Sequence, residues 1–187
     1  FSLQQHAGRS DPLLKISDLH TANTLQQDRE ALQQTLKIID VRGKGDPARW
    51  NLADLDERLK RELRSLPVQT VIRSDDIGVL RNILQGAAAE SGLDVTGNNV
   101  ADADSGAYLL AASIDSQAPM FKDEWHWLRA TLKIELIAQD GMTVIGYKSW
   151  PLKVSAGSAS QLQALMMKAA DKKQKAELLN SVLEFAT

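Results

Sequence analysis

The residues best suited to chemistry lie in one short segment, residues 123–127, which reads DEWHW. His126 stands between Trp125 and Trp127, so the segment could form an aromatic recognition patch with a titratable centre. The alternative is a loop that packs its aromatic rings onto a neighbouring hairpin. The sequence leaves both interpretations open.

Other reactive residue types do not form a complete motif. The histidines, His6, His20 and His126, show no metal-ligand spacing. Asp102 and Asp104 resemble the start of a calcium loop, but the distal glutamate that such a loop needs is absent. We therefore interpret the segment around Asp102 as a capped turn and predict no metal site.

Nucleotide and nucleophile motifs are incomplete as well. Residues 43–45, GKG, lack the spacing of a phosphate-binding loop, and Ser158 lacks the GxSxG context of a catalytic serine, so we interpret it as a helix cap. We predict no catalytic residue and no cofactor. The adjacent carboxylates Asp75 and Asp76, or Asp123 and Glu124, keep a carboxylate hydrolase as the alternative.

Composition narrows the class of protein. The 187 residues carry a formal net charge of −2, so we expect no nucleic acid partner. Cysteine is absent, which excludes disulfides and thiolate chemistry. No apolar run is long enough to span a membrane. Because the sequence starts at Phe1, we expect a leader, a lipid anchor or a longer upstream part before it.

The first half of the chain predicts an arm followed by alternating elements. Residues 1–34 are polar and glutamine-rich and predict an arm or edge element, with a thin-faced helix over 21–34 as one option. We expect a single α/β domain over 35–187. Its expected strands lie at 35–41, 68–72 and 107–114, and its expected helices at 51–66, capped by Asn51, and 74–91, capped by Ser74 and ended near Gly92.

A β-hairpin is the clearest local signal. Apolar residues alternate with polar ones over 127–138, and Asp140-Gly141 predicts a tight type I′ turn before a return strand over 142–150. Pro151 should end that strand or mark it as an edge. We expect Trp127 and Trp150 to meet at the open end of this hairpin.

That open end is the predicted binding site, formed by Trp125, His126, Trp127 and Trp150. A small satellite core beneath the loop 115–125 is the competing interpretation of the same tryptophans.

The last element is a helix over 158–185 that packs across the sheet, with a solvated lysine face at 168–175. The fold class is α/β (α+β), a four- to five-stranded mixed or antiparallel sheet with helices mainly on one face.

The order of elements from Leu52 onward resembles the group of bacterial envelope proteins that contains the TolB amino-terminal domain, CsgG and LpoB. Three stretches carry the resemblance: a strand ending in arginine before a helix, a segment that reads AYLLAASI, and the hairpin. The matching residues are Arg73, Leu80, Ile83 and Leu84; Ala107 to Ala111, Ser113 and Ile114; and Leu132, Ile134, Leu136, Asp140, Gly141, Val144, Ile145 and Ser149.

The resemblance covers about two thirds of the chain, and its motifs are structural. Ala112 stands near a position where the group often has glycine, and the pore-forming insertions of the curli protein are not visible. The resemblance implies a four-stranded sheet with helices on one side. It also implies export to the periplasm, frequent lipid anchoring and action through protein binding.

We therefore expect a non-catalytic accessory protein, periplasmic or associated with the outer membrane. It would form the soluble part of a lipoprotein or envelope protein and bind other envelope proteins. The alternatives are the carboxylate hydrolase and a structural module of a larger protein.

Overall fold

The computed structural model describes residues 12–40, 50–74, 77–95 and 107–186. The chain divides into two compact units, residues 1–65 with 186–187, and residues 66–185. The expected division into an arm before residue 35 and one domain after it stays a prediction.

The second unit is built on a mixed five-stranded sheet. The strands are β1 (Val68–Ile72), β2 (Tyr108–Ser116), β3 (Met120–Lys122), β4 (Trp125–Ile137) and β5 (Val144–Ala156). β1 is parallel to β2, whereas β4 runs antiparallel to β2, β3 and β5. The expected mixed sheet is confirmed, and β2 lies in its interior between β1 and β4.

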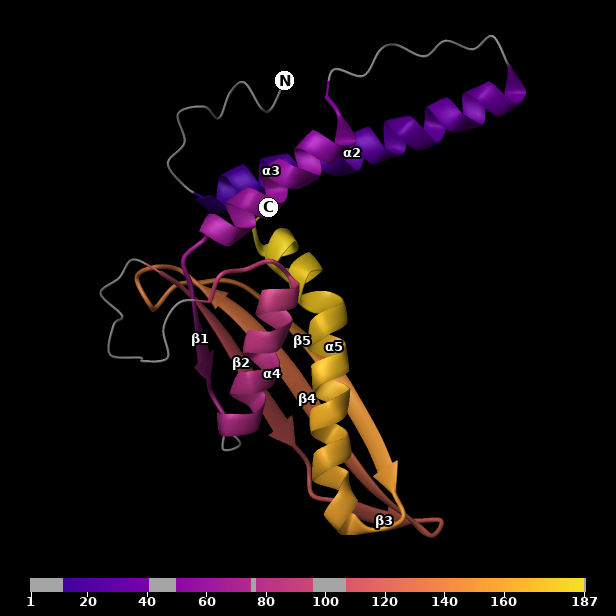
Figure 1. Cartoon of the computed structure of the whole chain (residues 1–187). Coiled ribbons are helices and arrows are strands. Elements are labelled where there is room, and N and C mark those ends of the chain that lie inside the picture. The colour runs from indigo at the N-terminus through magenta and orange to yellow at the C-terminus, as the bar shows by residue number, and fades with distance from the viewer. Residues whose placement is uncertain (1–11, 41–49, 75–76, 96–106, 187) are drawn as a thin grey trace. The chain divides into compact units, whose positions relative to one another are not determined.

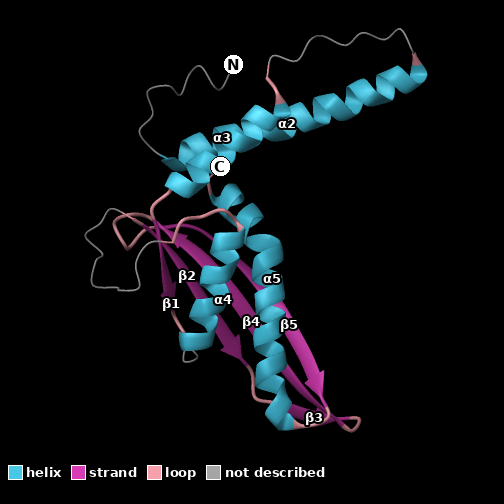
Figure 2. Cartoon of the chain, in the orientation of Figure 1, coloured by secondary structure: helices cyan, strands magenta, loops and turns pink. Residues whose placement is uncertain are grey.

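Two helices cover one face of this sheet. Figure 1 shows α4 (Ile77–Glu90) and α5 (Leu162–Phe185) side by side over the strands, and Figure 2 shows the resulting two layers. A short 3₁₀ turn, η2 (Ala159–Gln161), precedes α5. The expected α+β fold with helices mainly on one face is therefore confirmed for this unit.

Alternation along β4 decides which side chains meet the helices. Successive strand residues point to opposite faces, so every second residue of β4 shares the helix-covered face. On that face Leu132, Ile134 and Leu136 are fully buried, and Leu128 and Ala130 nearly so. Between them come polar residues of the opposite face, which we call the open face. The buried and exposed faces of the predicted hairpin follow from this two-residue period.

The long β4 strand pairs with two segments along one edge. Beyond β2, the Gln117 N–H donates to the Arg129 carbonyl, and Met120 then pairs with Trp127. Ala118 and Pro119 thus stand opposite the single residue Leu128, which is the count of a β-bulge. Pro119 cannot donate a ladder hydrogen bond, so β2 and β3 form one interrupted strand along β4.

The turn between β4 and β5 differs from the predicted type I′ turn. Only Gly141 has a positive φ, of 71°, whereas a type I′ turn needs two such residues. The loop is wider, closed by Ala138 N–H to Thr143 carbonyl at 2.7 Å and by Asp140. The Asp140 carboxylate accepts the N–H groups of Met142 and Thr143, both at 2.8 Å, and the Thr143 hydroxyl.

These bonds hold the pKa of Asp140 below its ordinary value, with the Thr143 hydroxyl as the largest cause. Because the folded pKa is lowered, the carboxylate stabilises the loop at neutral pH. Its contribution disappears only as the pH falls through that lowered pKa.

The cap positions are confirmed at two helices. The Asn51 side-chain oxygen accepts the Ala53 N–H at 3.0 Å at the start of α3 (Leu52–Ser65). Gly92 has φ of 81°, and Leu93 N–H donates to Ala88 O at 3.0 Å, which closes α4 as a Schellman motif. The expected cap at Ser158 is wrong, since that side chain makes no capping bond.

At Ser74, the hydroxyl donates to the Ile114 carbonyl. The acidic residues predicted after it, 75–76, lie outside the described residues, as do the loop 42–49 and the calcium-like segment at 102–104.

The first unit contains α2 (Pro12–Ile39) and α3, which contact each other. The expected strand at 35–41 is wrong, because its described part continues α2 through Ile39. No glycine or proline follows Pro12 in this helix, and the Thr35 hydroxyl donates to the Ala31 carbonyl at 3.0 Å. Ile38 is 83% exposed, so it lacks the side-chain packing on a sheet that makes β-branched residues favourable in strands.

Gly146 permits close approach between β5 and α5. A Cβ atom at Gly146 would overlap the ring of Phe185. We predict that Gly146→Ala lowers the free energy of unfolding by about 1–3 kcal/mol, because the helix end must shift. Urea denaturation measures this. Gly157→Ala, where a Cβ meets open space, is the control; equal losses in the two variants would refute the close-packing explanation.

Gln174 is the least favourable polar residue of the second unit. Its side chain is fully buried in α5, and neither amide atom has a hydrogen-bond partner in the described structure. We predict that Gln174→Met raises the free energy of unfolding by about 1–3 kcal/mol, since an unpaired buried amide is replaced by an apolar chain of similar length. Exposed Gln163→Met should change it by less than about 0.5 kcal/mol; a destabilised Gln174→Met would show that the amide is satisfied.

Candidate functional site

The aromatic segment forms a second, smaller hairpin that the sequence did not reveal. β3 pairs with the start of β4, with Met120 opposite Trp127 and Lys122 opposite Trp125. The connecting residues, Asp123 and Glu124, have φ of 52° and 64°. Two consecutive positive φ angles are typical of a type I′ turn, which normally takes asparagine and glycine. Glu124 therefore holds a strained backbone conformation.

This hairpin presents large apolar side chains to solvent. Met120, Phe121 and Trp125 are 48%, 67% and 50% exposed. We call these three residues the hairpin tip. Trp125 and Met120 share the open face of the sheet with Trp127, whereas Phe121 and His126 lie on the opposite side. An exposed cluster of this kind is typical of a protein contact surface.

Neighbouring contacts hold the tip in place. The rings of Phe121 and His126 lie 4.8 Å apart between centroids, at an interplanar angle of 50°. The Trp127 indole N–H donates to the Lys122 carbonyl at 3.3 Å, and the Lys153 ammonium lies 4.2 Å from the Trp127 ring. Trp127 is half-buried, so it supports the hairpin while Trp125 faces solvent.

The predicted meeting of Trp127 and Trp150 is wrong. β5 continues through Pro151 to Ala156, and the register sets Trp150 opposite Leu132 and Trp127 opposite Ser155. Trp150 therefore lies on the helix-covered face, 8% exposed, with Lys173 of α5 over its ring. Trp125, His126 and Trp127 are adjacent as predicted, and their binding role stays a prediction.

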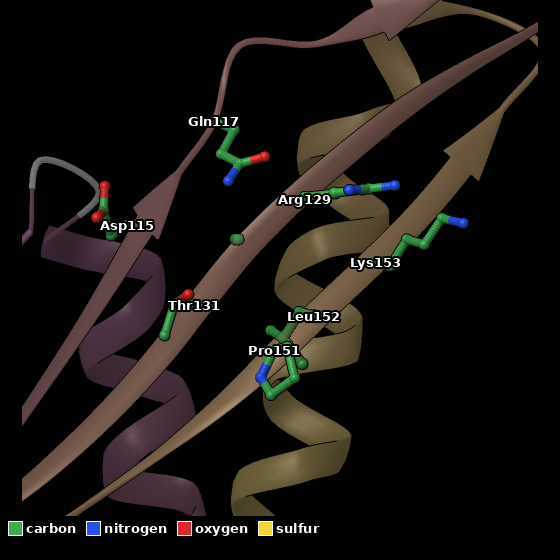
Figure 3. A pocket seen from close by; sticks show the side chains of 8 residues that line it. Asp115, Gln117, Arg129, Thr131, Pro151, Leu152 and Lys153 are labelled. Atoms are coloured by element: carbon green, nitrogen blue, oxygen red, sulfur yellow. The ribbon is translucent and has the colours of Figure 1, made fainter. Parts of the chain in front are cut away.

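A shallow hollow of about 480 Å³ lies on the open face beyond the hairpin. Figure 3 shows its side chains coming from the end of β2 and from the neighbouring strands β4 and β5. Arg129 and Thr131 come from β4, Pro151 and Lys153 from β5, and Asp115 and Gln117 from β2 and the residue beyond it. The hollow has cations at one side and a single carboxylate at the other.

A separate polar network crosses the open face farther along the sheet. Glu135 accepts Arg73 at 2.9 Å and Lys133 at 2.5 Å. The Lys133 ammonium also lies 5.0 Å from the ring of Tyr147. The carboxylate is thus fully engaged by two cations of its own chain.

Part of the expected solvated lysine face of α5 is engaged in ion pairs. Lys175 contacts Glu90 of α4 at 3.1 Å and Asp171 at 3.3 Å, and these hydrogen bonds raise its pKa. Lys168 and Lys172 are exposed, as predicted. A raised lysine pKa keeps the ion pair charged throughout the neutral range.

Catalytic geometry is not found among the described residues. No group of three histidines or carboxylates there could hold a metal ion. Asp54 and Glu57 line another hollow on α3, but Arg58 and Arg61 line it as well. None of the helices in the described ranges combines the length and apolar character that crossing a membrane requires.

The missed site residues are Met120 and Phe121. The segment MFKDEWHW contains two three-residue runs around the pair Asp-Glu, which is the spacing of a two-residue hairpin. The signal was weak because neither turn residue is glycine or asparagine.

A scan against protein-family models gave no match, and neither did a search of curated proteins. Similar folds occur in solved structures of bacterial lipoproteins. A minor lipoprotein from Acinetobacter baumannii has a TM-score of 0.48 and 12% identity, covering 61% of this chain and 90% of its own. A putative lipoprotein from Caulobacter crescentus has a TM-score of 0.38 and 20% identity, covering 68% and 91%.

A lipoprotein from Neisseria meningitidis has a TM-score of 0.37 and 13% identity, covering 58% of this chain and 97% of its own. All three of these solved structures are described as lipoproteins. The narrower resemblance to the TolB, CsgG and LpoB group stays a prediction.

The strained turn yields a direct test of the hairpin. We predict that Glu124→Gly raises the free energy of unfolding by about 0.5–1 kcal/mol, because glycine adopts φ of 64° without steric cost. Glu124→Ala keeps the strain and should leave stability nearly unchanged. Thermal or urea unfolding measures both variants; equal effects would contradict the type I′ turn.

Proposed function

We propose that this chain is a non-catalytic accessory protein of the bacterial envelope that acts by binding another envelope protein. It is part of a lipoprotein, periplasmic or associated with the outer membrane. The hairpin tip, Met120, Phe121 and Trp125, is the anchor that enters the partner's surface.

One observation carries the proposal: apolar side chains that could be buried stand exposed on a hairpin. Trp125 and Phe121 are at least half exposed, although each would gain on the order of 2 kcal/mol from burial. Tryptophan is enriched among the residues that dominate binding energies. A partner that covers the tip would recover this energy.

The tip is also arranged in advance. β3 pairs with β4 over three residues, and the Phe121–His126 and Trp127–Lys122 contacts fix the rings beside it. Rigid anchors lose little conformational entropy on binding, so more of the buried area appears as affinity. The strain at Glu124 supports the same conclusion, because strained turns persist where the exposed geometry is useful.

The envelope location is supported by the sequence resemblance. Its matching stretches correspond to β1 with α4, to β2, and to the β4–β5 hairpin. These elements form the core of the second unit and leave the β3–β4 hairpin as an addition at one end of the sheet. In this arrangement the sheet is the common scaffold and the β3–β4 hairpin makes the partner contact.

The test uses the full chain as bait in a bacterial envelope extract, with quantitative mass spectrometry of the captured proteins. We expect Phe121→Ser/Trp125→Ser to reduce capture of the specific partner at least tenfold, because two anchors are lost. Met142→Ser/Tyr147→Ser removes two exposed side chains at the other hairpin, 87% and 64% exposed, and should capture normally. Unchanged capture by the Phe121/Trp125 variant would overturn the assignment.

A further inference from the structure

Two cations face each other on the open face of the sheet. Arg129 of β4 is directly opposite Lys153 of β5, and both side chains are exposed. Directly opposed like charges on one face of a strand pair are unfavourable. The pair therefore costs stability unless a negative group joins it.

Two other cations of the same face share a carboxylate. Arg73 and Lys133 converge on Glu135, at 2.9 and 2.5 Å. Within the described residues, neither Arg129 nor Lys153 has a carboxylate within ion-pair distance. Glu135 thus neutralises the Arg73–Lys133 pair. The Arg129–Lys153 pair has no such carboxylate among the described residues and could accept an anion from a ligand.

The surroundings of this pair suit an acceptor-only ligand. The Arg129–Lys153 pair lines the hollow of about 480 Å³ together with the Gln117 amide and the Thr131 hydroxyl, both potential donors. Arginine can donate two parallel N–H bonds to one carboxylate. The Lys153 ammonium is held 4.2 Å from the Trp127 ring, which places it at the hairpin side of the hollow.

Asp115 narrows the choice of anion. It lines the same hollow and stands opposite Thr131, which is two residues along β4 from Arg129. Its carboxylate repels any additional negative charge there. A singly charged carboxylate that occupies only the cationic side fits this arrangement better than a multiply charged phosphate.

We propose that Arg129 and Lys153 form a carboxylate-binding subsite for an aspartate, a glutamate or a C-terminus of the partner protein. The subsite rests on the proposed function and extends it, since Arg129 and Lys153 share the open face with Trp127 and with Met120 and Trp125 of the hairpin tip. The partner segment therefore carries an apolar residue for the tip and a carboxylate at a fixed spacing from it.

A phage-displayed library of random twelve-residue peptides, selected on the immobilised full chain, tests this. We expect the selected peptides to combine an aromatic or aliphatic residue with Asp, Glu or a free C-terminus. Exchanging that carboxylate for an amide should weaken binding at least tenfold to the natural chain and less than twofold to Arg129→Gln/Lys153→Gln. Lys168→Gln/Lys172→Gln, which removes the same charge from α5, should bind as the natural chain does.

The outcomes separate the two proposals. Selected peptides without a carboxylate preference, no selected peptides at all, or equal binding by the Arg129/Lys153 variant would overturn the subsite and leave the hairpin tip standing. Carboxylate-dependent peptides that ignore Phe121→Ser/Trp125→Ser would support the subsite and overturn the tip.

Vesicles of phosphatidylcholine with phosphatidylglycerol provide the remaining arm. Retention that requires Arg129 and Lys153 would assign the pair to lipid phosphate and overturn the carboxylate assignment. An unchanged or higher thermal midpoint of Arg129→Gln/Lys153→Gln shows that any lost binding is not lost folding.

Discussion

Burial of one face of the sheet beneath α4 and α5 is the constraint on which the second unit depends. A shift of β4 by one residue would move Leu132, Ile134 and Leu136 into solvent and bring Lys133 and Glu135 under the helices. That cost fixes the register, and the register in turn decides every neighbour on the open face. The opposition of Arg129 and Lys153, and the separation of Trp127 from Trp150, follow from it.

The sequence predicted the elements whose signals are local and periodic. The alternation in β4, the leucine stripe of α3 with its Asn51 cap, and the glycine that ends α4 each report a short-range interaction, and each is confirmed. The errors arose where tertiary context decides. Residues 35–39 include the β-branched Thr35, Ile38 and Ile39, yet they extend α2. Adding residues to a helix that is already formed costs less than starting a new element.

The candidate site was predicted only in part. Adjacent residues such as Trp125, His126 and Trp127 are close in any fold, so their proximity could be predicted without knowing the strand register. Pro151 was expected to end the return strand or mark it as an edge, and the second alternative holds: β5 continues to Ala156, which sets Trp150 opposite Leu132 and away from Trp127. Phe121 and the Arg129–Lys153 pair depend on strand pairing across a bulge, which the sequence does not encode locally.

Pro151 has a further consequence for the behaviour of the molecule at high concentration. Among the described strands β5 pairs with β4 alone, so its other side is an edge of 13 residues, long enough to template strand addition between copies. Proline lacks the N–H that such addition requires, and the same strand carries the cations Lys148 and Lys153, which disfavour pairing between edges. Pro151 thus interrupts the row of edge N–H groups that strand addition between copies would use.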